Sequence, residues 1–123
     1  MKDLTDRRRN IRVFFDAKVD VYSETGEIIS NKTKDVSFKG LYVLSEKKPS
    51  IGEICNVNMR LNGEDNIVLK FKGKVIRHDD KGFVLSFIAT DLDTLSHLKN
   101  ILYYNSGDPE RIDKELRKMF GLE

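Results

Sequence analysis

The sequence predicts a small β-barrel followed by two α-helices. Six strand-like segments, most with apolar residues at alternate positions, are separated by turn residues, and the apolar spacing becomes helical after Thr90. The 123 residues, 39% of them hydrophobic, suffice for one modest core. Six strands with one apolar face each need a sandwich or a barrel to hide their edges, and Gly73 inside a long strand suggests the bend of a barrel.

The first three strands precede a break at Pro49. Residues 13–22 alternate between apolar and polar positions, as a half-buried strand does. Residues 27–34 are more polar, and we expect them to form a strand at a sheet edge. Residues 40–45 form a short strand that is apolar on both faces.

The last three strands show the clearest alternation. Residues 55–61 and 67–75 each place apolar residues on one face, and Asn62-Gly63 between them is a hairpin signal. A tight turn over residues 79–82 leads to the sixth strand, residues 83–87.

Two amphipathic helices follow. The first has leucine and isoleucine at helical spacing from Leu92 to Leu102, with Thr90 and Asp93 as its expected capping pair, and it ends before residues 105–107. Asp108 is the expected N-cap of the second helix. We interpret both as packing elements, with partner binding as a second interpretation for the last helix.

These patterns divide the chain into a mobile basic arm (residues 1–12), the barrel (13–90) and a helical extension packed on or beside it (91–123). No apolar run exceeds four residues, so we expect no membrane insertion, no secretory signal and a cytoplasmic location. The single cysteine, Cys55, agrees with a reducing compartment.

Signals of catalysis are weak. His78 and His97 lie in different elements, and the sequence lacks the nucleophile and phosphate-loop motifs. The run His78-Asp79-Asp80 fits turn chemistry better than a metal site, and Cys55 fits a buried, inert thiol. We therefore expect neither an enzyme nor a metal or cofactor.

The N-terminal arm concentrates positive charge. The whole chain has a net charge of +2, whereas five basic and two acidic residues give the first twelve positions +3. Four of the eight arginines are Arg7, Arg8, Arg9 and Arg12. A guanidinium binds phosphate oxygens, or the O6 and N7 edge of guanine, through paired donors. A solvated basic tail is the alternative.

A second candidate segment comprises residues 35–40. Asp35 and Ser37 point the same way on extended backbone and are suited to accept from a donor edge such as guanine N1–H and N2–H₂. Gly40 allows a flat ligand to approach the backbone. The alternative is a turn in which a side chain caps its own backbone.

Together these segments resemble the PilZ family of cyclic di-GMP receptors. The family's RxxxR motif matches Arg8 and Arg12, and its [DN]xSxxG motif matches Asp35, Ser37 and Gly40. Residues 73–87 are similar to its closing hairpin, so the resemblance covers about residues 6–89. It implies a six-stranded antiparallel barrel with a helix beside it.

The resemblance also implies roles for individual residues. Arg8 and Arg12 would hold phosphate and guanine, Asp35 and Ser37 would bond a guanine edge, and Gly40 would leave room for the ring. Arg7, directly before RxxxR, implies an intercalated ligand dimer, two molecules per chain. Arg9 adds charge to the site or stays solvated.

We expect the arm to order around the ligand and to signal to a partner protein. Two alternatives stay open. A nucleic-acid-binding module would use the arm on phosphates, but Asp35 would repel a phosphate backbone. A PilZ-like adaptor without ligand would act through protein contacts alone. Arg77 and His78 receive no role.

Overall fold

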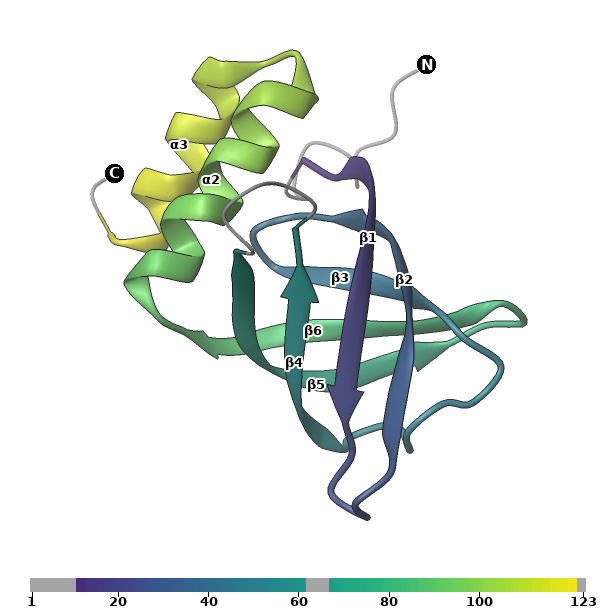
Figure 1. Cartoon of the computed structure of the whole chain (residues 1–123). Helices are drawn as coiled ribbons and strands as arrows, with labels where there is room; N and C mark the ends of the chain where they lie inside the picture. Colours follow the sequence, from purple (N-terminus) through teal and green to yellow (C-terminus); the bar gives the residue numbers. More distant parts are fainter. Residues whose placement is uncertain (1–10, 62–66, 122–123) are drawn as a thin grey trace.

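The computed structural model describes residues 11–61 and 67–121. Six antiparallel strands form a closed barrel in the order β1-β2-β3-β6-β5-β4, followed by two helices (Figure 1). This confirms the predicted fold class. The elements are β1 (Val13–Tyr22), β2 (Ile28–Val36), β3 (Gly40–Leu44), β4 (Ile54–Arg60), β5 (Val68–His78), β6 (Gly82–Thr90), α2 (Leu92–Ser106) and α3 (Pro109–Met119).

The prediction that the second strand lies at a sheet edge was wrong. β2 pairs with β1 on one side and with β3 on the other. A closed barrel has no edges, and every polar residue of β2 except Thr33 faces solvent. Its inward residues, Ile29, Thr33 and Val36, are buried.

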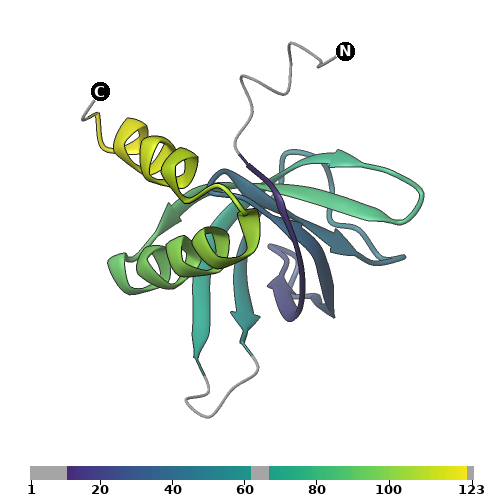
Figure 2. The ribbon, with the colours of Figure 1, turned by 90° about the horizontal axis from the view of Figure 1, so that it is seen from above.

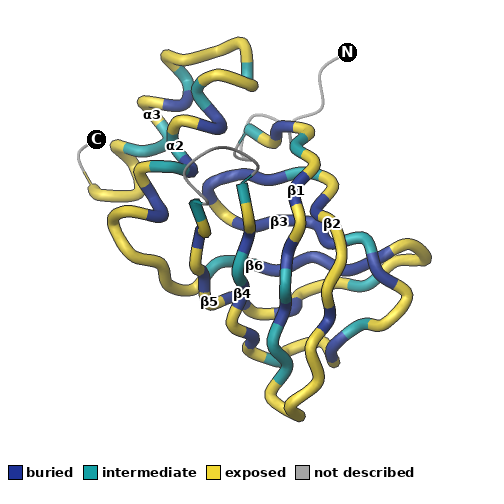
Figure 3. Tube along the Cα trace, in the orientation of Figure 1, coloured by how far each residue is buried: buried dark blue, intermediate teal, exposed yellow. Residues whose placement is uncertain are grey.

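Alternation along the strands builds the core, as Figure 3 shows by the buried and exposed residues that follow one another along the trace. Val19, Leu41 and Leu85 are among the fully buried side chains from three different strands. The pairing of β5 with β6 is irregular at Lys72–Gly73. This agrees with the bend expected at Gly73.

The two helices begin at aspartates. The Asp91 carboxylate accepts a 2.7 Å hydrogen bond from the Thr94 N–H and caps α2. The predicted capping by Thr90 and Asp93 was therefore wrong, because Thr90 still belongs to β6 and its hydroxyl donates to the Lys70 carbonyl. The Asp108 carboxylate caps α3 as expected, accepting from the Arg111 N–H.

The helices pack beside the barrel. α2 contacts β5 and β1, and α3 packs on α2 (Figure 2). Leu95, Leu98 and Leu102 of α2 and Ile112 of α3 join the same core cluster as the strands. Neither helix in the described ranges is long and apolar enough to cross a bilayer.

Candidate functional site

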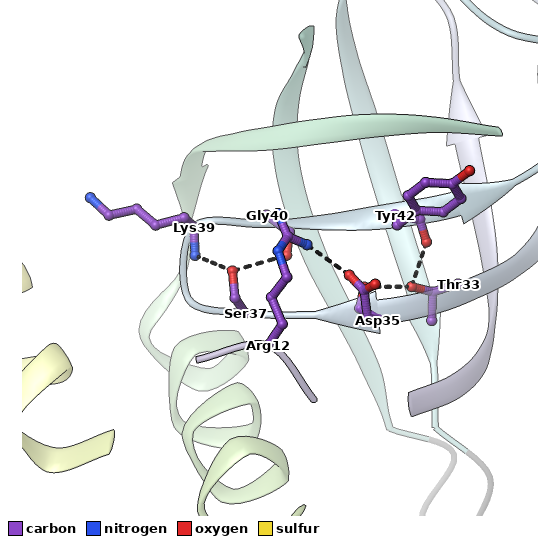
Figure 4. A network of polar contacts seen from close by, with 7 residues as sticks. All are labelled: Arg12, Thr33, Asp35, Ser37, Lys39, Gly40 and Tyr42. Atoms are coloured by element: carbon purple, nitrogen blue, oxygen red, sulfur yellow. Dashed lines mark hydrogen bonds and ion pairs between the residues drawn. The ribbon is translucent and has the colours of Figure 1, made fainter. Parts of the chain in front are cut away.

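The structure brings part of both candidate segments together on the outside of the barrel. Arg12 directly precedes β1, and its Nη1 lies 2.7 Å from Oδ1 of Asp35 in β2 (Figure 4). The pairing of Val13 with Val36 and of Phe14 with Asp35 explains this approach across 23 residues of sequence. The two side chains remain 41% and 24% exposed, so solvent and ligands can reach the pair.

A bulge in β2 turns Asp35 outward. Thr33 pairs with Val43 and Asp35 pairs with Tyr42, which leaves Lys34 as an extra residue on β2. On a regular strand Thr33 and Asp35, which are two residues apart, would share a face. Instead Thr33 is buried, and its hydroxyl contacts the carbonyl oxygens of Asp35 and Tyr42 at 3.1 and 2.9 Å.

Ser37 lies in the turn between β2 and β3, where its side chain binds the backbone. Its Oγ accepts from the Lys39 N–H at 3.1 Å and lies 3.5 Å from the Gly40 carbonyl oxygen, while its own N–H donates to that oxygen at 2.9 Å. Ser37 is only 1% exposed. In this structure its hydroxyl therefore caps the turn, the alternative interpretation of this segment.

Gly40 is required by the neighbouring strand. A Cβ at this position would lie 2.1 Å from the carbonyl oxygen of Leu85 in β6. Gly82 lies near the other end of the β3–β6 pairing, and a Cβ there would lie 1.9 Å from the carbonyl oxygen of Val43. Close approach of backbone to backbone thus explains both glycines.

Tyr42 and Arg77 are neighbours of the site that the sequence analysis did not assign. The Tyr42 hydroxyl donates to the Asp79 carboxylate, and Lys34 Nζ lies 5.5 Å from the centre of the tyrosine ring. Burial, and then the bond to Asp79, raise the pKa of Tyr42 to about 12. The pKa of Asp79 is lowered, first by the Tyr42 hydroxyl and then by backbone N–H groups, and Arg77 contributes in the same direction.

Strand pairing aligns these residues across the barrel. Phe14, Asp35 and Tyr42 stand opposite one another on β1, β2 and β3, and Val84 of β6 then connects Tyr42 to Arg77 of β5. The sequence alone does not reveal this row of five residues, because each member comes from a different strand and only the strand pairing aligns them. Cationic donors beside carboxylate acceptors suit a ligand that has both phosphates and donor edges.

Three predicted ligand residues, Arg7, Arg8 and Arg9, lie outside the described residues. Of the other four, Arg12 directly precedes β1, Asp35 lies on β2, Ser37 lies between β2 and β3, and Gly40 begins β3 (Figure 4).

The remaining candidates for chemistry have structural roles. Cys55 is buried, and burial raises the pKa of its thiol to about 11. A ring nitrogen of His78 lies 2.6 Å from the Pro49 carbonyl oxygen, and Asp79 accepts from the N–H groups of Lys81 and Gly82 within its turn. Over residues 11–61 and 67–121, no three metal-ligating side chains form a cluster.

A family comparison matches residues 6–104 to the PilZ domain. The chain belongs to the PilZ domain family. PilZ domains are non-catalytic receptor domains for cyclic di-GMP, which agrees with the absence of catalytic motifs from this sequence. No curated protein matches the chain.

Solved structures show the same PilZ fold. The inhibitor of motility MotI/DgrA from Bacillus subtilis is 20% identical, with a TM-score of 0.64 over 91% of this chain and 53% of that one. The chain thus spans about half the length of that relative. The PilZ domain of YcgR from Escherichia coli, solved with c-di-GMP, is 14% identical and has a TM-score of 0.64. The match covers 94% of this chain and 98% of that one. The PilZ domain of CeSA from a cellulose-synthesizing bacterium is 19% identical and has a TM-score of 0.59. The match covers 75% of this chain and 94% of that one.

Proposed function

We propose that this chain is a cytoplasmic receptor that binds cyclic di-GMP through Arg7, Arg8, Arg9, Arg12, Asp35, Ser37 and Gly40. The observation that carries the proposal is the ion pair between Arg12 and Asp35, because it joins the RxxxR and DxSxxG motifs at one place on the barrel. The match to the PilZ domain supplies the ligand class.

The ion pair suits replacement by a ligand. An exposed pair of this kind contributes at most about 1 kcal/mol, so separating Arg12 from Asp35 costs little. The freed guanidinium then binds a phosphate or the O6 and N7 edge of guanine, and the freed carboxylate accepts from guanine N1–H and N2–H₂.

Ser37 and Gly40 shape the turn beneath the ligand. The Ser37 hydroxyl contacts the Gly40 carbonyl oxygen at the long distance of 3.5 Å. The Ser37 oxygen accepts the 3.1 Å bond from the Lys39 N–H with one lone pair, and its second lone pair accepts from the donor edge of guanine. Gly40 keeps the wall flat where the ring lies.

The arm closes over the ligand and orders as it does so. Ordering six arm residues costs roughly 6–12 kcal/mol of backbone entropy. Hydrogen bonds to charged groups contribute about 1.5–3 kcal/mol each, so four to six of them, with stacking, offset that cost. The ordered arm and the ligand form a new surface that a partner protein reads.

Calorimetric titration with cyclic di-GMP tests the proposal. We expect Arg12→Ala and Asp35→Ala each to weaken binding roughly 10- to 100-fold, the loss of one charge-assisted hydrogen bond or more. Arg60→Ala is the matched control, because Arg60 forms a similar 2.9 Å ion pair with Asp20 away from the motifs. Its affinity should equal that of the native protein.

Three results would reject the proposal or parts of it. No heat with the native protein rejects the receptor function. Binding of DNA that falls steeply with salt and shows little base preference would instead support the nucleic-acid-binding module. Saturation at one ligand per chain rejects the intercalated dimer that Arg7 implies, and unchanged amide exchange of residues 6–12 rejects ordering of the arm.

A further inference from the structure

The C-terminal helix contacts the chain directly before Arg12. The backbone N–H of Ile11 donates a 2.9 Å hydrogen bond to Oε2 of Glu115 in α3, 104 residues away in the sequence. Figure 1 shows the start of β1 next to the helices. Two consecutive residues are thus held by side chains, Ile11 by Glu115 and Arg12 by Asp35.

Glu115 is held firmly in this position. Its side chain is only 11% exposed, and its Oε2 also lies 3.4 Å from Nε of Arg111, one helical turn earlier. Ile112 is fully buried in the core, and Leu116 and Ile11 pack against the same core. A carboxylate at such a place is costly unless it is hydrogen-bonded, and these donors provide that compensation.

We propose that Glu115 is a positioning residue for the arginine arm, and that it couples ligand binding to the docking of α3. This inference rests on the proposed binding of cyclic di-GMP. The hydrogen bond to Glu115 already restricts the backbone at Ile11 in the free protein, so less conformational entropy is lost when the ligand binds. Coupling between sites is reciprocal, so a ligand that orders the arm must also stabilise the contact with α3.

Affinity for cyclic di-GMP is the first measurement. Glu115→Ala should weaken binding roughly threefold to tenfold, the effect of losing one hydrogen bond that orders the arm. Glu115→Gln keeps an acceptor oxygen for the Ile11 N–H and should bind within about twofold of the native protein. Asp113→Asn is the matched control, because it removes one negative charge from the exposed side of the same helix, where Asp113 lies 4.0 Å from Lys99.

Amide exchange of residues 109–119, with and without the ligand, is the second measurement. Cyclic di-GMP should slow exchange of α3 in the native protein and in Asp113→Asn, and should lose that effect in Glu115→Ala. A purely structural role of Glu115 would change the stability of α3 without making it depend on the ligand.

The outcomes separate this inference from the proposed function. If the native protein binds cyclic di-GMP but exchange of α3 does not respond, the coupling is wrong and the receptor function stands. Equal affinities of the native protein and a folded Glu115→Ala variant would likewise overturn the positioning role. If the native protein does not bind the ligand, both proposals are rejected.

Discussion

Single residues decide which groups the barrel presents at the site. Asp35 faces outward because the pairing of β2 with β3 is irregular between Thr33 and Asp35, and it meets Arg12 because β1 and β2 pair in the register Val13 to Val36. The same bulge buries Thr33, whose hydroxyl stays hydrogen-bonded inside. The irregular pairing thus separates the buried Thr33 side chain from the outward-facing Asp35.

Gly40 permits a direct test at this scale. Gly40→Ala places a methyl group 2.1 Å from the Leu85 carbonyl oxygen, so β3 and β6 must separate. We expect a loss of about 1–3 kcal/mol in the free energy of unfolding, as for other overpacked sites, measured by chemical denaturation. In Gly73→Ala, the control, the new Cβ meets its nearest atom at 3.4 Å, and the loss should stay below about 1 kcal/mol.

At the scale of elements, α2 is joined to the barrel by its first turn. Thr94 is buried, its N–H donates to Asp91, and its Oγ1 accepts from the N–H of Lys70 in β5 at 3.0 Å. The apolar face of α2 then packs on the core. Since α3 packs on α2, this first turn also sets where Glu115 meets Ile11.

Replacing Thr94 tests this connection. Thr94→Val keeps the shape of the side chain but leaves the Lys70 N–H without its acceptor, so we expect a loss of about 1–3 kcal/mol in the free energy of unfolding. Thr90→Val removes an exposed hydroxyl that donates to the Lys70 carbonyl and should cost less than about 1 kcal/mol. Equal losses in the two variants would show that the first turn of α2 has no special part in docking.

At the scale of the whole molecule, the order of the strands in the sheet aligns the residues of the candidate site. The row from Phe14 through Asp35 and Tyr42 to Arg77 exists only because β1, β2, β3, β6 and β5 are consecutive in the sheet. The inward residues of the same strands form one core that includes both helices. Barrel, helices and site should therefore unfold together.

Leu85 tests that cooperativity from the centre of the core. Leu85→Ala should lower the free energy of unfolding by about 2–5 kcal/mol through lost burial and a cavity, in a single transition seen equally by far-ultraviolet circular dichroism and tyrosine fluorescence. Ile88→Ala, on the same strand but 52% exposed, should cost less than about 1 kcal/mol. Separate transitions by the two probes would contradict a single cooperative unit.

Local patterns predicted much of this arrangement. Alternation with a period of two identified the inward residues of the strands, and Asp108 marked the start of α3. Two predictions were wrong because contacts with neighbouring elements decide them. β2 is not an edge strand, since it pairs with β1 and β3, and Asp91 rather than Thr90 caps α2. Sequence spacing likewise gave no place to Arg77, which strand pairing brings into the row of Tyr42.

The amino-acid sequence by itself thus determined the barrel, its helices and the motif positions, because these follow from local periodicity and from residue chemistry. Only the tertiary structure decided that Arg12 pairs with Asp35, that the Ser37 hydroxyl caps its turn, and that Glu115 holds Ile11. The physical reason is register: a bulge at one residue or the docking angle of a helix changes which distant side chains meet, and no local pattern encodes it.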